Sequence, residues 1–145
     1  LTTIAQTAFF NCTSLASVTF GSALRTIGQS AFSRCSSLDN ITFPDTLTQI
    51  NQNAFSNCTS LTSITLPSSV SFIYSSAFAN CTSLATITIL GSIAPYLISS
   101  GSNEVNQRNS SVFKNVGTRF VEMQIGVTNI DEGGVFYGSL QIVYV

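Results

Sequence analysis

The most informative absences in this sequence are histidine and charged side chains. The chain has no His, and Lys, Arg, Asp and Glu together make up only 8% of its 145 residues. Without imidazole groups and without a Cys-x-x-Cys spacing, a zinc site has little support. Nucleic-acid binding is not expected either, because it requires clustered Lys and Arg, whereas this chain has five scattered basic residues and a net charge of −1.

Long apolar runs are missing as well. No apolar segment approaches the roughly 18 residues of a membrane-spanning helix, so we expect no membrane insertion in this segment. The 44% of apolar residues must instead be buried in a repeated stripe. The sequence begins inside a repeat, with neither an initiator Met nor a signal peptide, and we therefore expect a fragment of a longer protein.

What the sequence does contain is a 23-residue repeat, whose clearest copy includes Asn53–Pro67. A fixed period in this range indicates a solenoid of stacked coils, because one such unit cannot bury its apolar side alone. Two sets of residues recur at this period: Cys12, Cys35, Cys58 and Cys81, and the pairs Ala8-Phe9, Ala31-Phe32, Ala54-Phe55 and Ala77-Phe78.

Each coil is predicted to contain one short strand and one tight turn. The segment Ala-Phe-x-x-Cys suits a short helical or 3₁₀ turn that buries its Ala, Phe and Cys together. The following Leu-x-x-Ile-x-Leu alternates apolar residues with Thr, as a half-buried strand does. Pro44 and Pro67 come after the strand, where Pro helps to turn the chain. We expect the successive strands to pair in parallel in one continuous sheet, with the Phe residues in one interior column.

The regular pattern occupies residues 1–92, which predicts four coils, and two degenerate coils follow over residues 93–145, about six in all. Phe113 follows Phe78 after 35 residues, one period plus 12, and Phe136 follows 23 residues later. The intervening polar insertion near residues 99–110 lacks periodicity and is predicted to be a surface loop. Strand-like triplets of the last two coils are expected at Phe120/Met123/Ile125 and Leu140/Val143/Val145.

The motif Leu-Thr-Ser-Ile-Thr-Leu-Pro at residues 61–67, together with Ala-Phe-x-Asn-Cys-Thr-Ser-Leu, resembles the BspA-like leucine-rich repeats. These are 23-residue repeats of surface proteins of host-associated bacteria and of some parasitic protists. The match covers coils one to four closely, whereas coils five and six depart from it, with Val116 in place of Cys. The resemblance implies a right-handed leucine-rich-repeat solenoid that is secreted or displayed on the cell surface, often for adhesion, and it implies no catalytic residue.

The candidate binding face is the outward side of the strands. Four Thr residues occupy equivalent positions between the inward strand residues: Thr19, Thr42, Thr65 and Thr88. Thr also favours strands and stacks well on itself, so this column has a purely structural explanation too. An ice-binding surface is a remote further alternative, since regular Thr-x-Thr arrays can match a lattice. Anchors of a binding surface are usually aromatic or charged, and the variable polar positions lie in the C-terminal coils, at Glu122, Gln124 and Tyr144.

We therefore expect a non-catalytic module that binds a protein, either a host matrix protein or a protein on another cell surface. The alternative is a passive spacer within a larger surface protein. Asp131 and Glu132 precede two Gly residues and are typical of a solvated turn. Because no nucleophile–base pairing accompanies them, no catalytic site, metal site or cofactor site is predicted.

The Cys and Asn residues of the repeat each allow more than one interpretation. The four Cys are predicted to be reduced and buried as small apolar groups. Disulfides and a metal site are the less favoured alternatives, because stacked side chains about 4.8 Å apart lie slightly beyond disulfide reach. The sequence Asn-x-Ser/Thr marks either glycan acceptors or turn chemistry imposed by the repeat, at Asn11, Asn40, Asn57, Asn80 and Asn109.

Overall fold

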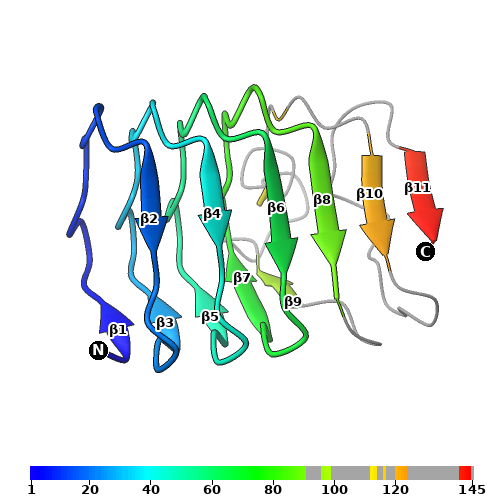
Figure 1. The fold of residues 1–145 in the computed structure, drawn as a ribbon, viewed down its shortest axis with the longest axis horizontal. Coiled ribbons are helices and arrows are strands. Elements are labelled where there is room, and N and C mark those ends of the chain that lie inside the picture. The colour runs from blue at the N-terminus through cyan, green and yellow to red at the C-terminus, as the bar shows by residue number, and fades with distance from the viewer. Residues whose placement is uncertain (91–95, 99–111, 114–115, 117–119, 124–140, 145) are drawn as a thin grey trace.

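The chain forms a solenoid whose coils stack from the N-terminus to the C-terminus (Figure 1). This computed structural model describes residues 1–90, 96–98, 112–113, 116, 120–123 and 141–144. Each coil descends through a front strand and rises behind it while advancing along the axis, which makes the winding right-handed (Figure 1), as parallel crossovers nearly always are. The predicted insertion near residues 99–110 and Phe136 lie outside the described residues.

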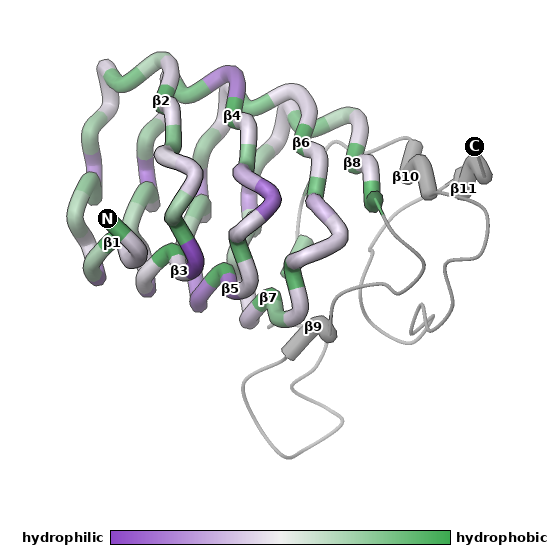
Figure 2. Tube along the Cα trace, turned by 60° about the horizontal axis from the view of Figure 1, so that its bottom comes forward, coloured by the Kyte–Doolittle hydropathy of each residue, from purple (hydrophilic) through white to green (hydrophobic). Residues whose placement is uncertain are grey.

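Two layers of parallel strands run along the solenoid. The front layer faces the viewer in Figure 1 and contains β2 (Ser17–Thr19), β4 (Asn40–Thr42), β6 (Ser63–Leu66), β8 (Thr86–Ile89), β10 (Phe120–Met123) and β11 (Gln141–Tyr144). The lower layer contains β1 (Thr3–Ile4), β3 (Thr26–Ile27), β5 (Gln49–Ile50), β7 (Phe72–Tyr74) and β9 (Tyr96–Ile98), which pair in that order. Figure 2, turned to bring the lower layer forward, shows its first four strands side by side.

The prediction of one strand per coil is therefore wrong, because each of the first four coils contains two. The second strand comes from the apolar-x-x-Ile step of the repeat, whose Ile is a buried residue of each short strand. In β3, for example, Thr26 is half-buried and Ile27 is fully buried. The structure describes about four full turns, and β10 and β11 extend the front layer beyond them. The predicted number of about six coils therefore differs slightly from the number of described turns.

The Ala-Phe-x-x-Cys segment is a run of hydrogen-bonded turns, and the described residues contain neither an α-helix nor a 3₁₀-helix. In coil three the N–H groups of Ala54, Ser56 and Cys58 donate to carbonyls three residues earlier. The intervening N–H groups of Asn53, Phe55 and Asn57 donate instead to carbonyls of the next coil.

Left-handed residues are the reason that this segment is not helical. Asn53 and Asn57 have φ of 56° and 62°, and equivalent residues of the other three regular coils have φ between 53° and 65°. A residue with positive φ every four positions interrupts a right-handed helix. The turns instead aim every second N–H group at the neighbouring coil, so the backbone itself joins the coils.

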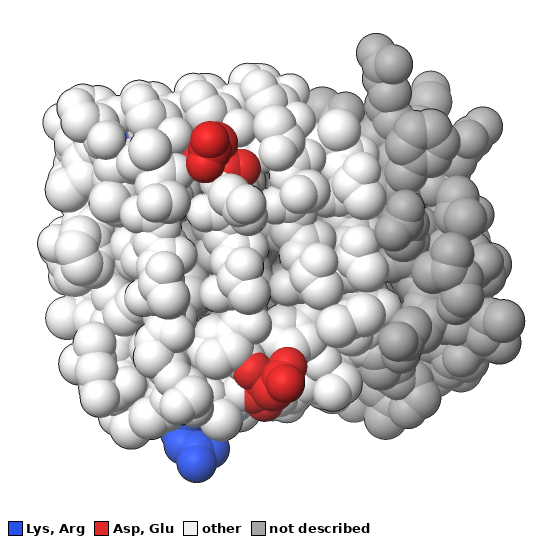
Figure 3. Space-filling model, viewed as in Figure 1, with Lys and Arg blue, Asp and Glu red and all other residues white. Residues whose placement is uncertain are grey.

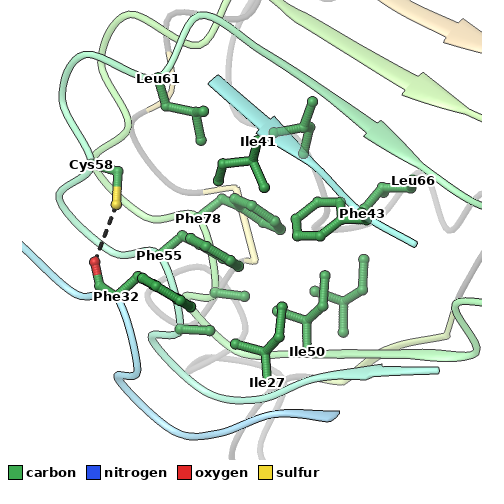
Figure 4. Packing of buried hydrophobic residues seen from close by; sticks show 14 of the residues in the cluster. Ile27, Phe32, Ile41, Phe43, Ile50, Phe55, Cys58, Leu61, Leu66 and Phe78 are labelled. Carbon is green, nitrogen blue, oxygen red and sulfur yellow. Dashed lines mark hydrogen bonds between the residues drawn. The ribbon is translucent and has the colours of Figure 1, made fainter. Parts of the chain in front are cut away.

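A stack of phenylalanine rings fills the interior (Figure 4). Neighbouring rings lie 4.9–5.3 Å apart between centroids and within 8° of parallel, in the order Phe9, Phe32, Phe55, Phe78 and Phe113. Phe113 thus continues the column after the 35-residue gap, as predicted. Phe9 lies at the N-terminal end of the stack and is 39% exposed, so it is only partly interior.

The cysteines are free thiols, and three of the four are buried as predicted. Cys35, Cys58 and Cys81 have no exposed surface, whereas Cys12 is exposed. The prediction that all four would be inaccessible is therefore wrong for Cys12. The physical reason is its place at the N-terminal end of the described stack, where coil two packs against only one side of the first coil.

Candidate binding surface

The outward side of the front layer consists of two polar rows. In β6 the side chains of Ser63 and Thr65 are exposed, while Ile64 and Leu66 are buried. Strand register aligns the equivalent residues of paired strands. The first row contains Ser17, Asn40, Ser63 and Thr86, and the second contains Thr19, Thr42, Thr65 and Thr88. The structure therefore brings the four predicted Thr residues together in the second row.

The front layer is divided between β4 and β6. β2 pairs with β4, and β6 begins a second sheet with β8, β10 and β11, but no strand pairing joins β4 to β6 in the described residues. Beside this break the Thr62 N–H group lies 3.5 Å from the carbonyl oxygen of Asp39, which is long for a hydrogen bond. The expectation of one continuous sheet is therefore wrong.

A hollow of about 370 Å³ opens at the division between β4 and β6. Its polar lining comes from both strands and from the turn after β4, and Pro67 and Phe43 are among its apolar lining residues. The polar lining residues are Asn40, Thr42, Asp45, Ser63 and Thr65. Hydroxyl and amide groups both donate and accept hydrogen bonds, so the hollow can pair with the backbone or polar side chains of a partner.

In coils one to four, charge on the front face is confined to its margins. Asp39 precedes β4 and Asp45 follows it, and both are exposed. Figure 3 shows two acidic patches near opposite ends of the strands, with an uncharged surface between them. A partner that contacts the centre of this face would therefore be recognised by hydrogen bonding and shape, and not by net charge.

The C-terminal candidates differ in their register. β10 pairs with β8 so that Glu122 lies opposite Thr88, which places Glu122 in the second polar row. Tyr144 of β11 lies opposite Met123, and Met123 lies opposite Ile89, so Tyr144 is in the row of a buried residue. Relative to this register, the strand triplets expected from the sequence are displaced by two residues in β10 and by one residue in β11. A displacement of one residue exchanges the two faces of a strand. Gln124 lies outside the described residues.

An aromatic pair on the lower layer was missed by the sequence analysis. Phe72 is 40% exposed and Tyr74 is half-buried, while Ile73 between them is fully buried. The signal for this pair is a break in the repeat, since the residues in register with Phe72 are Gln49 and, one coil earlier, Thr26. The row of Phe72 is polar in the earlier coils and continues with Tyr96 in β9. This change from polar to aromatic residues points to a local role that the repeat alone does not require.

The described residues contain no group of three or more His, Cys, Asp or Glu side chains placed to hold a metal ion. In the same part of the chain, no helix has the length and apolar character needed to cross a membrane.

The sequence model of the family "BspA type Leucine rich repeat region" matches residues 2–143 in six copies. The chain belongs to this BspA-type leucine-rich repeat family. A comparison with curated protein sequences found no significant match.

Solved structures of bacterial leucine-rich repeat proteins are similar to this BspA-type chain. It is 27% identical to the T. pallidum leucine-rich repeat protein TpLRR, with a TM-score of 0.70, over 99% of this chain and 63% of that one. It is 24% identical to a leucine-rich cell surface protein from Faecalibacterium prausnitzii, with a TM-score of 0.69, over 95% of this chain and 34% of that one. The pneumococcal vaccine antigen PcpA is 17% identical, with a TM-score of 0.75, over 99% of this chain and 34% of that one. The BspA-type chain thus spans about one to two thirds of the length of these neighbours.

Proposed function

We propose that this BspA-type repeat is a non-catalytic module that binds a protein of the host matrix or of another cell surface through its front layer. The observation that supports this most is the hollow between β4 and β6, because it interrupts an otherwise regular polar face. A regular polar row makes many similar weak contacts, whereas a hollow can accept one projecting side chain. Such a pocket near the centre of a face is where binding energy usually concentrates.

Placement outside the cell is part of the same proposal. One of the similar structures is described as a cell surface protein and another as a vaccine antigen. The surface of coils one to four also suits selective contact with proteins, because Arg25, Arg34, Asp39 and Asp45 are its only charged side chains. Nonspecific electrostatic attraction is therefore weak, and shape and hydrogen bonding must provide the specificity.

The direct test is a surface plasmon resonance assay on immobilised fibronectin and fibrinogen. Thr65→Arg places a long side chain over the hollow and should weaken binding at least about tenfold. Thr82→Arg is the matched control, because it adds the same charge at an exposed turn position outside the hollow. Both variants should melt at the temperature of the unsubstituted chain, since both positions are exposed.

The C-terminal candidates enter the same assay as Glu122→Ala and Tyr144→Ala, compared with Thr65→Ala. Glu122 shares the row of Thr88, so we propose it as a charged anchor of this face. Tyr144 lies in the row of Ile89, so the Tyr144→Ala result decides whether that candidate belongs to the binding face. If Thr65→Arg and Glu122→Ala bind like the unsubstituted chain, the site is not on the front layer.

The alternative is a passive spacer that holds another domain away from the cell surface. It predicts no measurable binding by the unsubstituted chain to either matrix protein. Ice binding is a remote third candidate. Among the coils with described side chains, only β8 has Thr at both outward positions, as Thr86 and Thr88, because the first row otherwise contains Ser and Asn.

A further inference from the structure

A second surface lies on the lower layer, away from the proposed protein-binding face. It is a groove of about 450 Å³ that crosses four coils near the ends of β1, β3, β5 and β7. Its lining residues are Gln6, Gly28, Gln29, Asn51, Gln52 and Tyr74. Four of these six residues have amide side chains, one has an aromatic ring, and none has a charge.

The repeat builds this groove from two neighbouring rows. Gln6, Gln29 and Gln52 are 23 residues apart and contribute one amide side chain from each coil. Gly28, Asn51 and Tyr74 form the adjacent row, one residue beyond the paired strand residues Ile27, Ile50 and Ile73. The groove therefore runs along the solenoid axis, across the strands.

Gly28 allows the floor of the groove to be close to the backbone of the first coil. A Cβ atom at this position would lie 2.6 Å from the carbonyl oxygen of Ile4 and 2.7 Å from the backbone nitrogen of Gln6. No side chain fits there without moving the backbone. Gly28 therefore contributes only backbone atoms to the groove, and Tyr74 borders the groove two coils further on.

The polar groups of the groove are partly held in place. Gln49 donates a hydrogen bond of 2.7 Å from its Nε2 to Oδ1 of Asn51. Asn51 and Gln52 are half-buried, which restricts their rotamers, whereas Gln6 and Gln29 are exposed. Phe72, 40% exposed and two residues before Tyr74 on the same side of β7, extends the apolar surface beside the groove.

This combination matches the chemistry of a neutral sugar. An amide side chain both donates and accepts hydrogen bonds, as vicinal hydroxyl groups do. An aromatic ring covers the apolar face of a pyranose, and the absence of charge disfavours anionic ligands. We propose that the groove binds an uncharged, linear oligosaccharide that lies along the solenoid axis.

The coil spacing supports a linear chain of sugars. Stacked rings of successive coils are 4.9–5.3 Å apart, which is close to the length of one pyranose residue in an extended β1,4-linked chain. Each sugar residue of such a chain can therefore contact the Gln of one coil, at Gln6, Gln29 or Gln52. Each contact is weak by itself, and affinity comes from repetition along the groove, so binding should strengthen with oligosaccharide length.

The test uses hexasaccharides and disaccharides of β1,4-linked glucose and of β1,4-linked N-acetylglucosamine, with calorimetry and amide NMR on the whole chain. A hexasaccharide of at least one series should bind at least about tenfold more tightly than its disaccharide. It should shift the side-chain NH₂ signals of Gln29 and Gln52. Gln29→Ala, at an exposed position, should lower affinity about three- to tenfold without changing the melting temperature.

The ring is tested by Tyr74→Ala, which should lower affinity about tenfold or more, and by Tyr74→Phe, which keeps the ring and should retain most of the affinity. Thr65→Arg on the front layer is the control and should leave sugar binding unchanged. This control also separates the two proposals, since it removes only the proposed protein binding.

Three results would overturn the oligosaccharide proposal. The first is that neither hexasaccharide binds at millimolar concentration. The second is binding that Gln29→Ala and Tyr74→Ala both leave unchanged. The third is an uncharged extended peptide that occupies the groove, shifts the same amide signals and is not displaced by either hexasaccharide, which would make this groove a peptide site.

Discussion

The thiol of Cys58 donates a hydrogen bond to the backbone carbonyl oxygen of Phe32, 3.3 Å away and 26 residues earlier in the chain (Figure 4). The same bond recurs from Cys35 to Phe9 and from Cys81 to Phe55, each at 3.1 Å. The buried Cys of the repeat thus does more than fill a small volume. Its S–H group links each coil to the previous one, beside the stacked rings.

Cys58→Ala should destabilise the chain by about 1–3 kcal/mol, because it removes this donor and leaves a small cavity in a fully buried site. Cys12→Ala is the matched control at the equivalent position of the first coil, where the side chain is exposed, and its effect should stay within about 0.5 kcal/mol. Urea unfolding followed by circular dichroism measures both. Equal effects of the two substitutions would show that burial and the thiol bond contribute nothing.

Thiol labelling should distinguish one cysteine from the other three. In native protein, Ellman's reagent should react rapidly with Cys12 alone, since Cys35, Cys58 and Cys81 are buried. In denaturant, all four thiols should react. Peptide mapping after brief native labelling identifies the site, and rapid native labelling of Cys58 or Cys81 would contradict the described packing.

Alkaline pH should destabilise the fold through Cys35. Burial, together with a smaller effect of the nearby Cys58, raises the pKa of this thiol from 9.0 to about 11. The folded state thus binds the proton more tightly than the unfolded state does. The resulting stabilisation is fully present below pH 9 and is lost as the pH rises through about 11.

Unfolding free energies measured between pH 8 and 11.5 test this dependence. Cys35→Ala removes the titrating thiol and should flatten the decline in stability over this range. An equally steep decline in Cys35→Ala would assign the alkaline sensitivity to other groups.

Phe55→Ala should cost about 3–5 kcal/mol of unfolding free energy, because it empties a fully buried place in the ring stack. Phe9→Ala removes the same side chain from the first coil, where the ring stacks on Phe32 at 4.9 Å but is 39% exposed. Its cost should be clearly smaller. Thermal and urea unfolding of the pair measures the difference, and similar values would mean that the first coil packs as tightly as the third.

The turn geometry predicts that Gly and Ala at Asn57 differ in stability. Both substitutions remove the hydrogen bonds of the Asn57 side chain with Ser56 and Asn80. Only Gly accepts the φ of 62° without strain, so Asn57→Ala should be less stable than Asn57→Gly by about 1 kcal/mol. A helical turn at this position would favour Ala instead, so urea unfolding of the two variants discriminates between the geometries.

The same contacts bear on the Asn-Cys-Thr sequences of the repeat. The left-handed backbone and the side-chain bond of 3.3 Å from Asn80 to Asn57 support a structural role for these Asn residues. Glycosylation at Asn11, Asn40, Asn57, Asn80 and Asn109 stays an open prediction. So does the division into a regular part over residues 1–92 and a degenerate part over 93–145.

The sequence by itself determined the features that depend on repetition. Equivalent residues of a 23-residue repeat must stack, so the Phe column followed from spacing alone, including Phe113 after an irregular gap. Alternation of apolar residues with Thr likewise predicted the front strands and the row of Thr19, Thr42, Thr65 and Thr88. A periodic pattern of burial is sufficient for these results, because it defines which side chains face the core.

Only the tertiary structure decided how the coils are joined and where that joining fails. The second strand layer, the left-handed turns and the break between β4 and β6 depend on hydrogen bonds between backbones, which side-chain periodicity does not encode. The exposure of Cys12 depends on what covers the end of the stack. Tyr144 changed rows because an offset of one residue between degenerate strands exchanges their faces.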